Sequence, residues 1–263
     1  MDLHLKDKRA FVAGSSQGLG YAAAHLLAKE GCRVAINGRE EEKIKRVAEK
    51  INKETGTQVI GLAGDVTLPD VPGKLIQQTA EAFGGLDILI TNTRGPKPGG
   101  IDALSEADWQ VGIDLCLMAH VRLIQSALPY LRKSSAASIL TVTSLTVRQP
   151  IPNLVISNSV RLATIGLTKS LALDLGKEGI RVNSIIPGWT ETERVTELFE
   201  FRAKANNSTV EEEAKRQAVE SPFGRLAKPE EFANAAVFLV SPAASYITGV
   251  MLSVDGGMIK STF

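Results

Sequence analysis

The fold is specified first by one stretch near the N-terminus, Ala13-Gly14-Ser15-Ser16-Gln17-Gly18-Leu19-Gly20. It follows the short apolar run Arg9–Ala13, which predicts a strand, and precedes the run Ala22–Glu30, which predicts a helix. Glycines at such a turn allow positive φ and let the backbone approach a phosphate closely. The free N–H groups and the dipole at the helix start attract a pyrophosphate. The stretch therefore predicts a dinucleotide-binding turn.

The rest of the chain repeats this alternation of short apolar runs and longer amphipathic stretches. Further strands are predicted at Arg33–Ile36, Val59–Ala63, Ile88–Thr91, Ser138–Thr143, Arg181–Ile186 and Met251–Val254. Further helices are predicted at Glu41–Thr55, Leu75–Phe83, Asp108–Leu131, Val160–Gly176 and Glu230–Leu239. Most of the strands are apolar almost throughout, as is typical of strands covered on both faces. We expect one α/β domain over residues 1–263, a Rossmann-type doubly wound parallel sheet of about seven strands with helices on both faces.

One segment interrupts the alternation. Residues Glu191–Gln217 are polar and highly charged, and they follow the sixth predicted strand. We expect a helical insertion here, for which two interpretations stay open. It is either a solvated helical hairpin or a mobile lid, because open parallel sheets bind ligands at the carboxyl ends of their strands.

Composition excludes several classes of protein. The chain has 263 residues, of which 44% are hydrophobic and 22% charged, and its formal net charge is +1. No basic excess points to nucleic acid or to an anionic membrane surface. Cys32 and Cys116 lie in apolar surroundings, and the three histidines are scattered, which predicts reduced thiols and no metal site. The start lacks the apolar core of a signal peptide, and no apolar run approaches ~20 residues. We expect a cytoplasmic protein.

The end of the second predicted strand bears on the choice of cofactor. An acidic residue there often binds the adenosine ribose, but this chain has Asn37-Gly38-Arg39. Arg39 can pair with a 2′-phosphate, and Ser15 can add a hydroxyl, so NADP(H) is favoured over NAD(H). Alternatively, Arg39 is a solvated loop cation. Asp65, at the end of the third strand, either meets the adenine amino group or caps a turn.

These residues resemble the short-chain dehydrogenase/reductase family over nearly the whole chain, from Arg9 to Gly257. The motifs that carry the resemblance are Gly14-x-x-x-Gly18-x-Gly20, Asp65-Val66, Asp87-Ile88-Leu89-Ile90-Thr91-Asn92, Ser144 at a strand end, Ile180-Arg181-Val182-Asn183, Pro187-Gly188 with Thr192, and Val254-Asp255-Gly256-Gly257. The resemblance implies that the cofactor is bound by Gly14, Ser15, Ser16, Gly18, Leu19, Gly20, Asp65, Val66, Asn92, Pro187, Gly188 and Thr192. It also implies that Ser144 binds the substrate oxygen and that the protein is a homo-oligomer, a tetramer or a dimer.

The chain departs from the family at the catalytic centre. The family has Tyr-x-x-x-Lys about a dozen residues after the serine, with the tyrosine as general acid or base. The aligned positions here are Ser157 and Arg161, and none of the three tyrosines of the chain lies in this segment. An asparagine often found in the long crossover helix is replaced by Asp114. Because a serine hydroxyl is a far weaker acid than a phenol, altered acid–base chemistry is expected.

These departures lead to a hypothesis with two alternatives for each residue. Ser144 and Ser157, with Arg161 behind them, would polarise a carbonyl, and water or Asp114 would supply the proton. Alternatively, Ser157 only caps a helix, and Arg161 only binds the cofactor ribose or a carboxylate. Arg94, Arg148 and Arg161 either face the site together, which would favour an anionic substrate, or Arg94 and Arg148 are solvated loop residues.

The resemblance predicts an NAD(P)-dependent oxidoreductase that transfers a hydride between nicotinamide and a small carbonyl or alcohol, such as a 3-oxoacyl compound, a keto acid or a sugar. Two alternatives stay open. One is a nucleotide-binding sensor or scaffold that has lost turnover. The other is an enzyme that uses the cofactor only structurally, for dehydration or isomerisation.

Overall fold

The structure, a computed structural model, describes residues 1–262 and contains a parallel sheet with the strand order β3-β2-β1-β4-β5-β6-β7. The strands are β1 (Arg9–Val12), β2 (Arg33–Gly38), β3 (Val59–Ala63), β4 (Ile88–Thr91), β5 (Ser138–Val142), β6 (Arg181–Pro187) and β7 (Met251–Val254). Every neighbouring pair is parallel. The chain order reverses direction between β1 and β4, where the ligand site of such a sheet is expected. The predicted fold class is confirmed.

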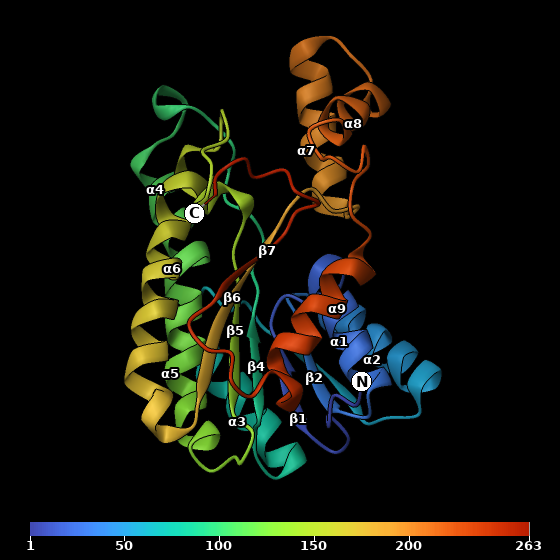
Figure 1. The fold of residues 1–263 in the computed structure, drawn as a ribbon, viewed down its shortest axis with the longest axis vertical. Coiled ribbons are helices and arrows are strands. Elements are labelled where there is room, and N and C mark those ends of the chain that lie inside the picture. The colour runs from blue at the N-terminus through green and yellow to red at the C-terminus, as the bar shows by residue number, and fades with distance from the viewer. Residues whose placement is uncertain (263) are drawn as a thin grey trace.

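Helices cover both faces of the sheet (Figure 1). They are α1 (Gly18–Lys29), α2 (Glu41–Thr55), α3 (Val71–Phe83), α4 (Glu106–Ile113), α5 (Ala119–Leu131), α6 (Val155–Leu175), α7 (Glu193–Asn206), α8 (Val210–Ala218) and α9 (Pro229–Val240). Helices α1, α2 and α9 pack on one face, where Leu27, Ile36 and Phe232 are buried. Helices α3, α5 and α6 pack on the other, around Phe11 and Leu123.

The helix predicted over Asp108–Leu131 is interrupted. A π-helical turn, Asp114–Met118, separates α4 from α5. Its carbonyl groups are held from outside the helix, since Thr93 Oγ1 donates to Leu115 O at 2.9 Å and Thr164 Oγ1 donates to Cys116 O. Such turns occur frequently at functional sites, and this one presents Asp114 at the edge of the cavity described below.

The same region departs from the expectation that no segment is long and apolar enough to span a membrane. Residues Glu106–Leu131 meet that criterion by length and composition. However, Leu123, Ile124 and Ala127 of this segment are buried against the sheet. It is therefore a core helix of the α/β fold.

The charged segment after β6 forms two helices. Thr192 caps α7 and Thr209 caps α8, each by accepting a backbone N–H bond. Phe199 of α7 stacks on Trp189, with ring centroids 5.7 Å apart. Figure 1 shows α7 and α8 projecting beyond the carboxyl ends of the strands, across from α4. The first turn of α7 thus stands at the edge where the strands end.

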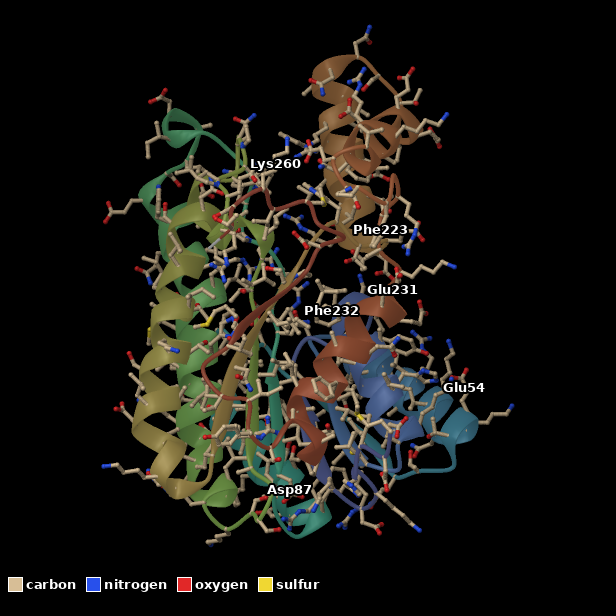
Figure 2. The ribbon with its side chains drawn as sticks, in the orientation of Figure 1. Glu54, Asp87, Phe223, Glu231, Phe232 and Lys260 are labelled. Carbon is tan, nitrogen blue, oxygen red and sulfur yellow. The ribbon has the colours of Figure 1, made fainter. Side chains whose placement is uncertain are left out.

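A buried ion pair fixes the opposite end of the sheet, where Figure 2 shows Asp87. Arg9 donates from Nε and Nη2 to the Asp87 carboxylate at 2.8 and 2.7 Å, and Ser134 Oγ donates at 2.5 Å. Burial by itself would raise the pKa of Asp87, but these hydrogen bonds outweigh it and hold the pKa below 3.8. The ionised carboxylate is therefore part of the folded state.

Replacing this carboxylate gives a prediction for stability. Asp87→Asn is expected to lower the free energy of unfolding at pH 7 by about 2–3 kcal/mol. The contribution of Asp87 is complete above about pH 4 and is lost as pH falls through its lowered folded-state pKa. Urea unfolding at pH 7 and near pH 3 checks this. The variant should lose less stability between the two than the wild type, and an identical loss would contradict the prediction.

Candidate functional site

The carboxyl ends of the strands open into a cavity of about 630 Å³. Residues after β1 to β6 and the start of α7 line it. Most of the predicted site residues are brought together here: Gly14, Ser16, Gly18, Leu19, Arg39, Asp65, Val66, Asn92, Asp114, Ser144, Ser157, Arg161, Pro187, Gly188 and Thr192. A cavity of this size and position fits a small-molecule site at the switch point of the sheet.

The glycine-rich turn forms the floor of one end of the cavity. Gly14 and Gly18 have φ of +54° and +59°. A Cβ at Gly14 would lie 2.8 Å from the carbonyl oxygen of Asn92, and a Cβ at Gly20 would overlap the carbonyl oxygen of Gly14. Asn92 Nδ2 donates to that same Gly14 oxygen at 3.0 Å. No side chain caps the start of α1, so its N–H groups are free to bind an anion, and the turn fits a pyrophosphate.

The prediction that the Ser15 hydroxyl contacts the cofactor is wrong. Its side chain is fully buried, its hydroxyl donates to Val12 O at 2.6 Å, and the same oxygen accepts from the Asn37 N–H at 2.9 Å. The buried hydroxyl thus bridges Val12 of β1 and Asn37 of β2, so it cannot reach a 2′-phosphate. Ser16 lines the cavity instead and lies next to Gly38.

The end of the cavity beyond β2 offers two cations, with the acidic Glu40 between them in sequence. Arg39 is exposed and lines it, and Lys43 from the first turn of α2 lies beside it, hydrogen-bonded to Gln17 Oε1. Sequence reasoning missed Lys43, although its position four residues after Arg39, at the start of a helix, could have indicated it. Asp65 lines the cavity and also makes the turn that was the alternative, accepting from Thr67 N and Oγ1 at 2.9 and 2.7 Å.

The other end of the cavity holds a cluster of hydroxyl groups. Ser144 Oγ accepts from Thr146 N at 3.3 Å, and Thr146 Oγ1 lies 3.0 Å from Ser157 Oγ. Helix α6 begins at Val155 with Leu154 as its N-cap, so the alternative that Ser157 caps the helix is wrong. Thr146, which sequence reasoning missed, joins the two serines. Its place two residues after Ser144 offered no signal by itself.

Arg161 lies one helical turn after Ser157 and is only 5% exposed. Its Nη1 donates to Val142 O and Thr143 O over long distances, 3.4 and 3.3 Å. Its Nε has no partner among the described residues. His120 is fully buried nearby, and burial together with the Arg161 charge lowers its pKa to about 3. Within residues 1–262, no carboxylate forms an ion pair with the Arg161 guanidinium.

The remaining charged residues predicted near the site are Asp114, Arg94 and Arg148, and they differ in their exposure and in their contacts. Asp114 forms an ion pair with Arg122 at 3.1 Å, so its carboxylate is already compensated. Arg94 is exposed and lines the cavity, whereas Arg148 is exposed and does not line it. Of the two alternatives for Arg148, the solvated loop residue therefore fits the structure, because Arg148 follows the 3₁₀ turn after Ser144 and lies outside the cavity lining. Arg194 of α7 was missed, and it lines the cavity and donates to Pro96 O at 3.2 Å.

Comparison with known proteins places this geometry in a family. A family model described as enoyl-(acyl carrier protein) reductase matches residues 13–259. The chain is 31% identical over 258 residues to the 3-oxoacyl-(acyl-carrier-protein) reductase FabG of Chlamydia muridarum, covering 98% of this chain and 100% of that one. It is 32% identical over 259 residues to dehydrogenase/reductase SDR family member 4 of Bos taurus, covering 97% and 88%. The chain belongs to the short-chain dehydrogenase/reductase family.

A solved structure gives the same result in three dimensions. This short-chain dehydrogenase/reductase matches L-sorbose reductase from Gluconobacter frateurii, in complex with NADPH and L-sorbose, with a TM-score of 0.94 and 32% identity. The match covers 99% of this chain and 100% of that one. The protein is thus an NAD(P)-dependent oxidoreductase of the dehydrogenase/reductase type. The alternative of a sensor without turnover is not favoured.

Proposed function

We propose that this protein is an NADP(H)-dependent oxidoreductase of a small carbonyl or alcohol in which Ser157 and Arg161 stand where the family has tyrosine and lysine. One observation carries the proposal. Ser144, Ser157 and Arg161 line the same cavity as the dinucleotide turn, and the buried Thr146 joins the two serines. A hydroxyl cluster with a cation behind it can bind the oxygen of a carbonyl as negative charge develops on it.

The cofactor is assigned to the strand ends. The turn from Gly14 to Gly20 would hold the pyrophosphate, and Arg39 with Lys43 the 2′-phosphate. Asp65 and Val66 would lie against the adenine, and Asn92, Pro187, Gly188 and Thr192 against the nicotinamide half. When bound, NADPH would supply the hydride that reduces the carbonyl carbon, becoming NADP⁺ while the carbonyl oxygen gains one proton. The similar L-sorbose reductase was solved as a complex with NADPH, which supports this choice of cofactor.

The hydroxyl groups can act together on the substrate oxygen. Ser144 Oγ accepts from the Thr146 N–H and keeps its own proton free to donate. If Thr146 Oγ1 donates to Ser157 Oγ, then the Ser157 proton is free as well. Two O–H donors can thus converge on one oxygen atom, with the Arg161 charge behind them.

The proton has a different source from that in most of the family. A serine hydroxyl is not a general acid of the strength of a phenol, so we assign no side chain as the proton donor. Hydride transfer to the carbonyl carbon would leave a strongly basic alkoxide, which takes its proton from solvent water and releases hydroxide to the solvent. Asp114, ion-paired with Arg122 at 3.1 Å, would orient that water as an acceptor rather than donate a proton itself.

The first turn of α7 is proposed as part of a lid over the cavity, formed by the insertion at residues 191–217. Thr192 and Arg194 line the cavity, and Arg194 bridges to the loop after β4. We also propose a cytoplasmic homo-oligomer, a tetramer or a dimer. Leu162 and Leu173, which are 50% and 71% exposed on α6, support an apolar face for a second copy.

The experiment is a titration of the protein with NADPH and with NADH, followed by nicotinamide fluorescence, and then a screen for NADPH oxidation by small carbonyls. The double change Arg39→Gln with Lys43→Gln should weaken NADPH binding about 10- to 100-fold, since each cation makes a charge-assisted bond to phosphate. Binding of NADH should stay within about threefold, because it lacks that phosphate. Equal weakening of both would contradict the assignment of these side chains. Absence of binding and of carbonyl reduction would overturn the proposed function.

A further inference from the structure

The substrate end of the cavity has an excess of positive charge. Three arginines from different elements line it: Arg94 after β4, Arg161 on α6 and Arg194 on α7. The carboxylates that line the cavity near them are those of Asp114 and Glu193. This positive charge can attract a substrate only if the arginines are not already paired with these carboxylates.

Neither carboxylate neutralises the arginines. Asp114 is paired with a fourth arginine, Arg122. The Glu193 carboxylate points toward the dinucleotide turn, since its Oε2 lies 3.6 Å from where a Cβ of Gly18 would be. It makes no ion pair with Arg94 or Arg161 in the described part of the chain, residues 1–262. The Asp114 and Glu193 carboxylates therefore do not offset the positive charge of Arg94 and Arg161.

The three arginines differ in the hydrogen bonds and ion pairs that they make within the protein. Arg194 has protein partners, since it donates to Pro96 O at 3.2 Å and pairs with Glu197 at 3.3 Å. Arg94 has neither a hydrogen bond nor an ion pair within residues 1–262. Arg161 is 95% buried with its Nε unpartnered and two long bonds to carbonyls. A buried cation without a counter-charge is costly, so an anion entering this end of the cavity would be stabilised.

The positions of Arg94 and Arg161, the two arginines with the fewest protein partners, indicate which chemical groups this end of the cavity can bind. Arg161 lies behind the hydroxyl cluster, where the reacting oxygen would bind. Arg94 lies at the mouth, in the loop that Arg194 contacts from α7. A guanidinium binds carboxylate and phosphate groups with two parallel hydrogen bonds. Because a bound dinucleotide would take up part of this 630 Å³ cavity, the substrate would have to be small.

We propose that the substrate is a small anionic carbonyl compound, or the corresponding hydroxy acid, whose charged group is bound by Arg94 while its carbonyl oxygen faces Ser144 and Ser157. This inference rests on the proposed function, because it names the substrate class of the same site. A carboxylate and a phosphate both supply the required chemistry. Arg194 would secure the loop that carries Arg94 when the lid lies over the cavity.

The test uses pairs of probes that differ in charge, added to the full-length protein with NADPH bound. The pairs are 2-oxobutanoate and its methyl ester, acetoacetate and its methyl ester, and dihydroxyacetone phosphate and dihydroxyacetone. Binding is followed by the fluorescence of the bound NADPH, and turnover by NADPH oxidation. We expect the charged member of at least one pair to bind at least about tenfold more tightly than its neutral partner. The first two pairs report a carboxylate and the third a phosphate.

Arg94→Gln should reduce that preference to about threefold or less, by weakening binding of the charged member and not of the neutral one. Arg148→Gln is the matched control, since Arg148 is an exposed arginine that does not line the cavity; it should keep the preference. Because Arg94 is exposed, its substitution leaves the fold intact. No preference in the wild type, or a preference that survives Arg94→Gln, overturns the inference.

The inference and the proposed function fail separately. Reduction of neutral probes without a charge preference leaves the proposed function standing and overturns the inference. If binding prefers the charged probes and depends on Arg94, but neither these probes nor the wider carbonyl screen gives NADPH oxidation, then the proposed function is overturned. Recognition of an anion by Arg94 then stands, but its assignment as substrate recognition is overturned.

Discussion

Arg161→Met is expected to make the protein more stable and nearly inactive. Wild-type Arg161 is 5% exposed, its Nε has no hydrogen-bond partner within residues 1–262, and its two hydrogen bonds to carbonyls are 3.3 and 3.4 Å long. Removing a buried, uncompensated charge should raise the free energy of unfolding by about 1–3 kcal/mol. The melting temperature should then rise by about 5 °C for a chain of this size. Methionine fills similar space without bringing a new polar group.

The same change should remove the positive charge behind the hydroxyl cluster. We expect kcat/KM for carbonyl reduction to fall by about 10²–10³, the usual cost of losing one electrostatic contact to a developing oxyanion. A substitution that raises the free energy of unfolding and lowers kcat/KM identifies a residue that serves activity while it destabilises the fold. Thermal unfolding and steady-state kinetics on the same preparation measure both effects.

Arg181→Met provides the matched control. Arg181 is partly buried, and its guanidinium donates to the carbonyl groups of Leu239, Val240, Ser241 and Ile247 at 2.6 to 3.3 Å. Its removal leaves these carbonyl groups, at the end of α9 and in the segment before β7, without that donor, so it should lower the free energy of unfolding by about 2–4 kcal/mol. A lower melting temperature for Arg161→Met, with kcat/KM unchanged, would mean that Arg161 is a structural residue like Arg181.

The parts of this site that the sequence predicted are those set by short-range constraints. Gly14 and Gly18 have positive φ because the chain must turn directly from β1 into α1, and only local sequence is needed to see this. Register explains the contrast between Ser15 and Ser16. The first turns inward to join β1 to β2, and the second faces the cavity. The sequence alone gives two adjacent serines with no preference between them.

Long-range packing determined what the sequence could not predict. Arg94 and Arg148 both follow strands, yet only Arg94 lines the cavity, because a short 3₁₀ turn redirects the chain before Arg148. The lack of a counter-charge for Arg161 depends on where Asp114 and Glu193 point, and these lie on other elements. The break at Asp114 is likewise supported from Thr93 and Thr164, which are distant in sequence.

The largest change in activity is expected from Ser157→Tyr combined with Arg161→Lys. Ser157 lines the cavity at the start of α6, so a larger side chain there can extend into it. A phenol with a lysine one helical turn away can deliver the proton that the serine cannot. A positioned general acid contributes about 10²–10⁴ in rate, so reduction of neutral carbonyls by NADPH should increase within this range.

The control must distinguish the effect of the phenol hydroxyl from the effect of a larger side chain at residue 157. Ser157→Phe with Arg161→Lys has nearly the same shape but no acidic proton, and it should show no gain. The Ser157→Tyr variant should also acquire a fall in rate at high pH as its phenol ionises, which the wild type, having no such acid, should lack. If the tyrosine variant folds, binds NADPH and gains no activity, then the acid–base pair is not what distinguishes this site. The arginines and Asp114 would then be the residues that distinguish the cavity, and the substrate would not receive its proton from residue 157.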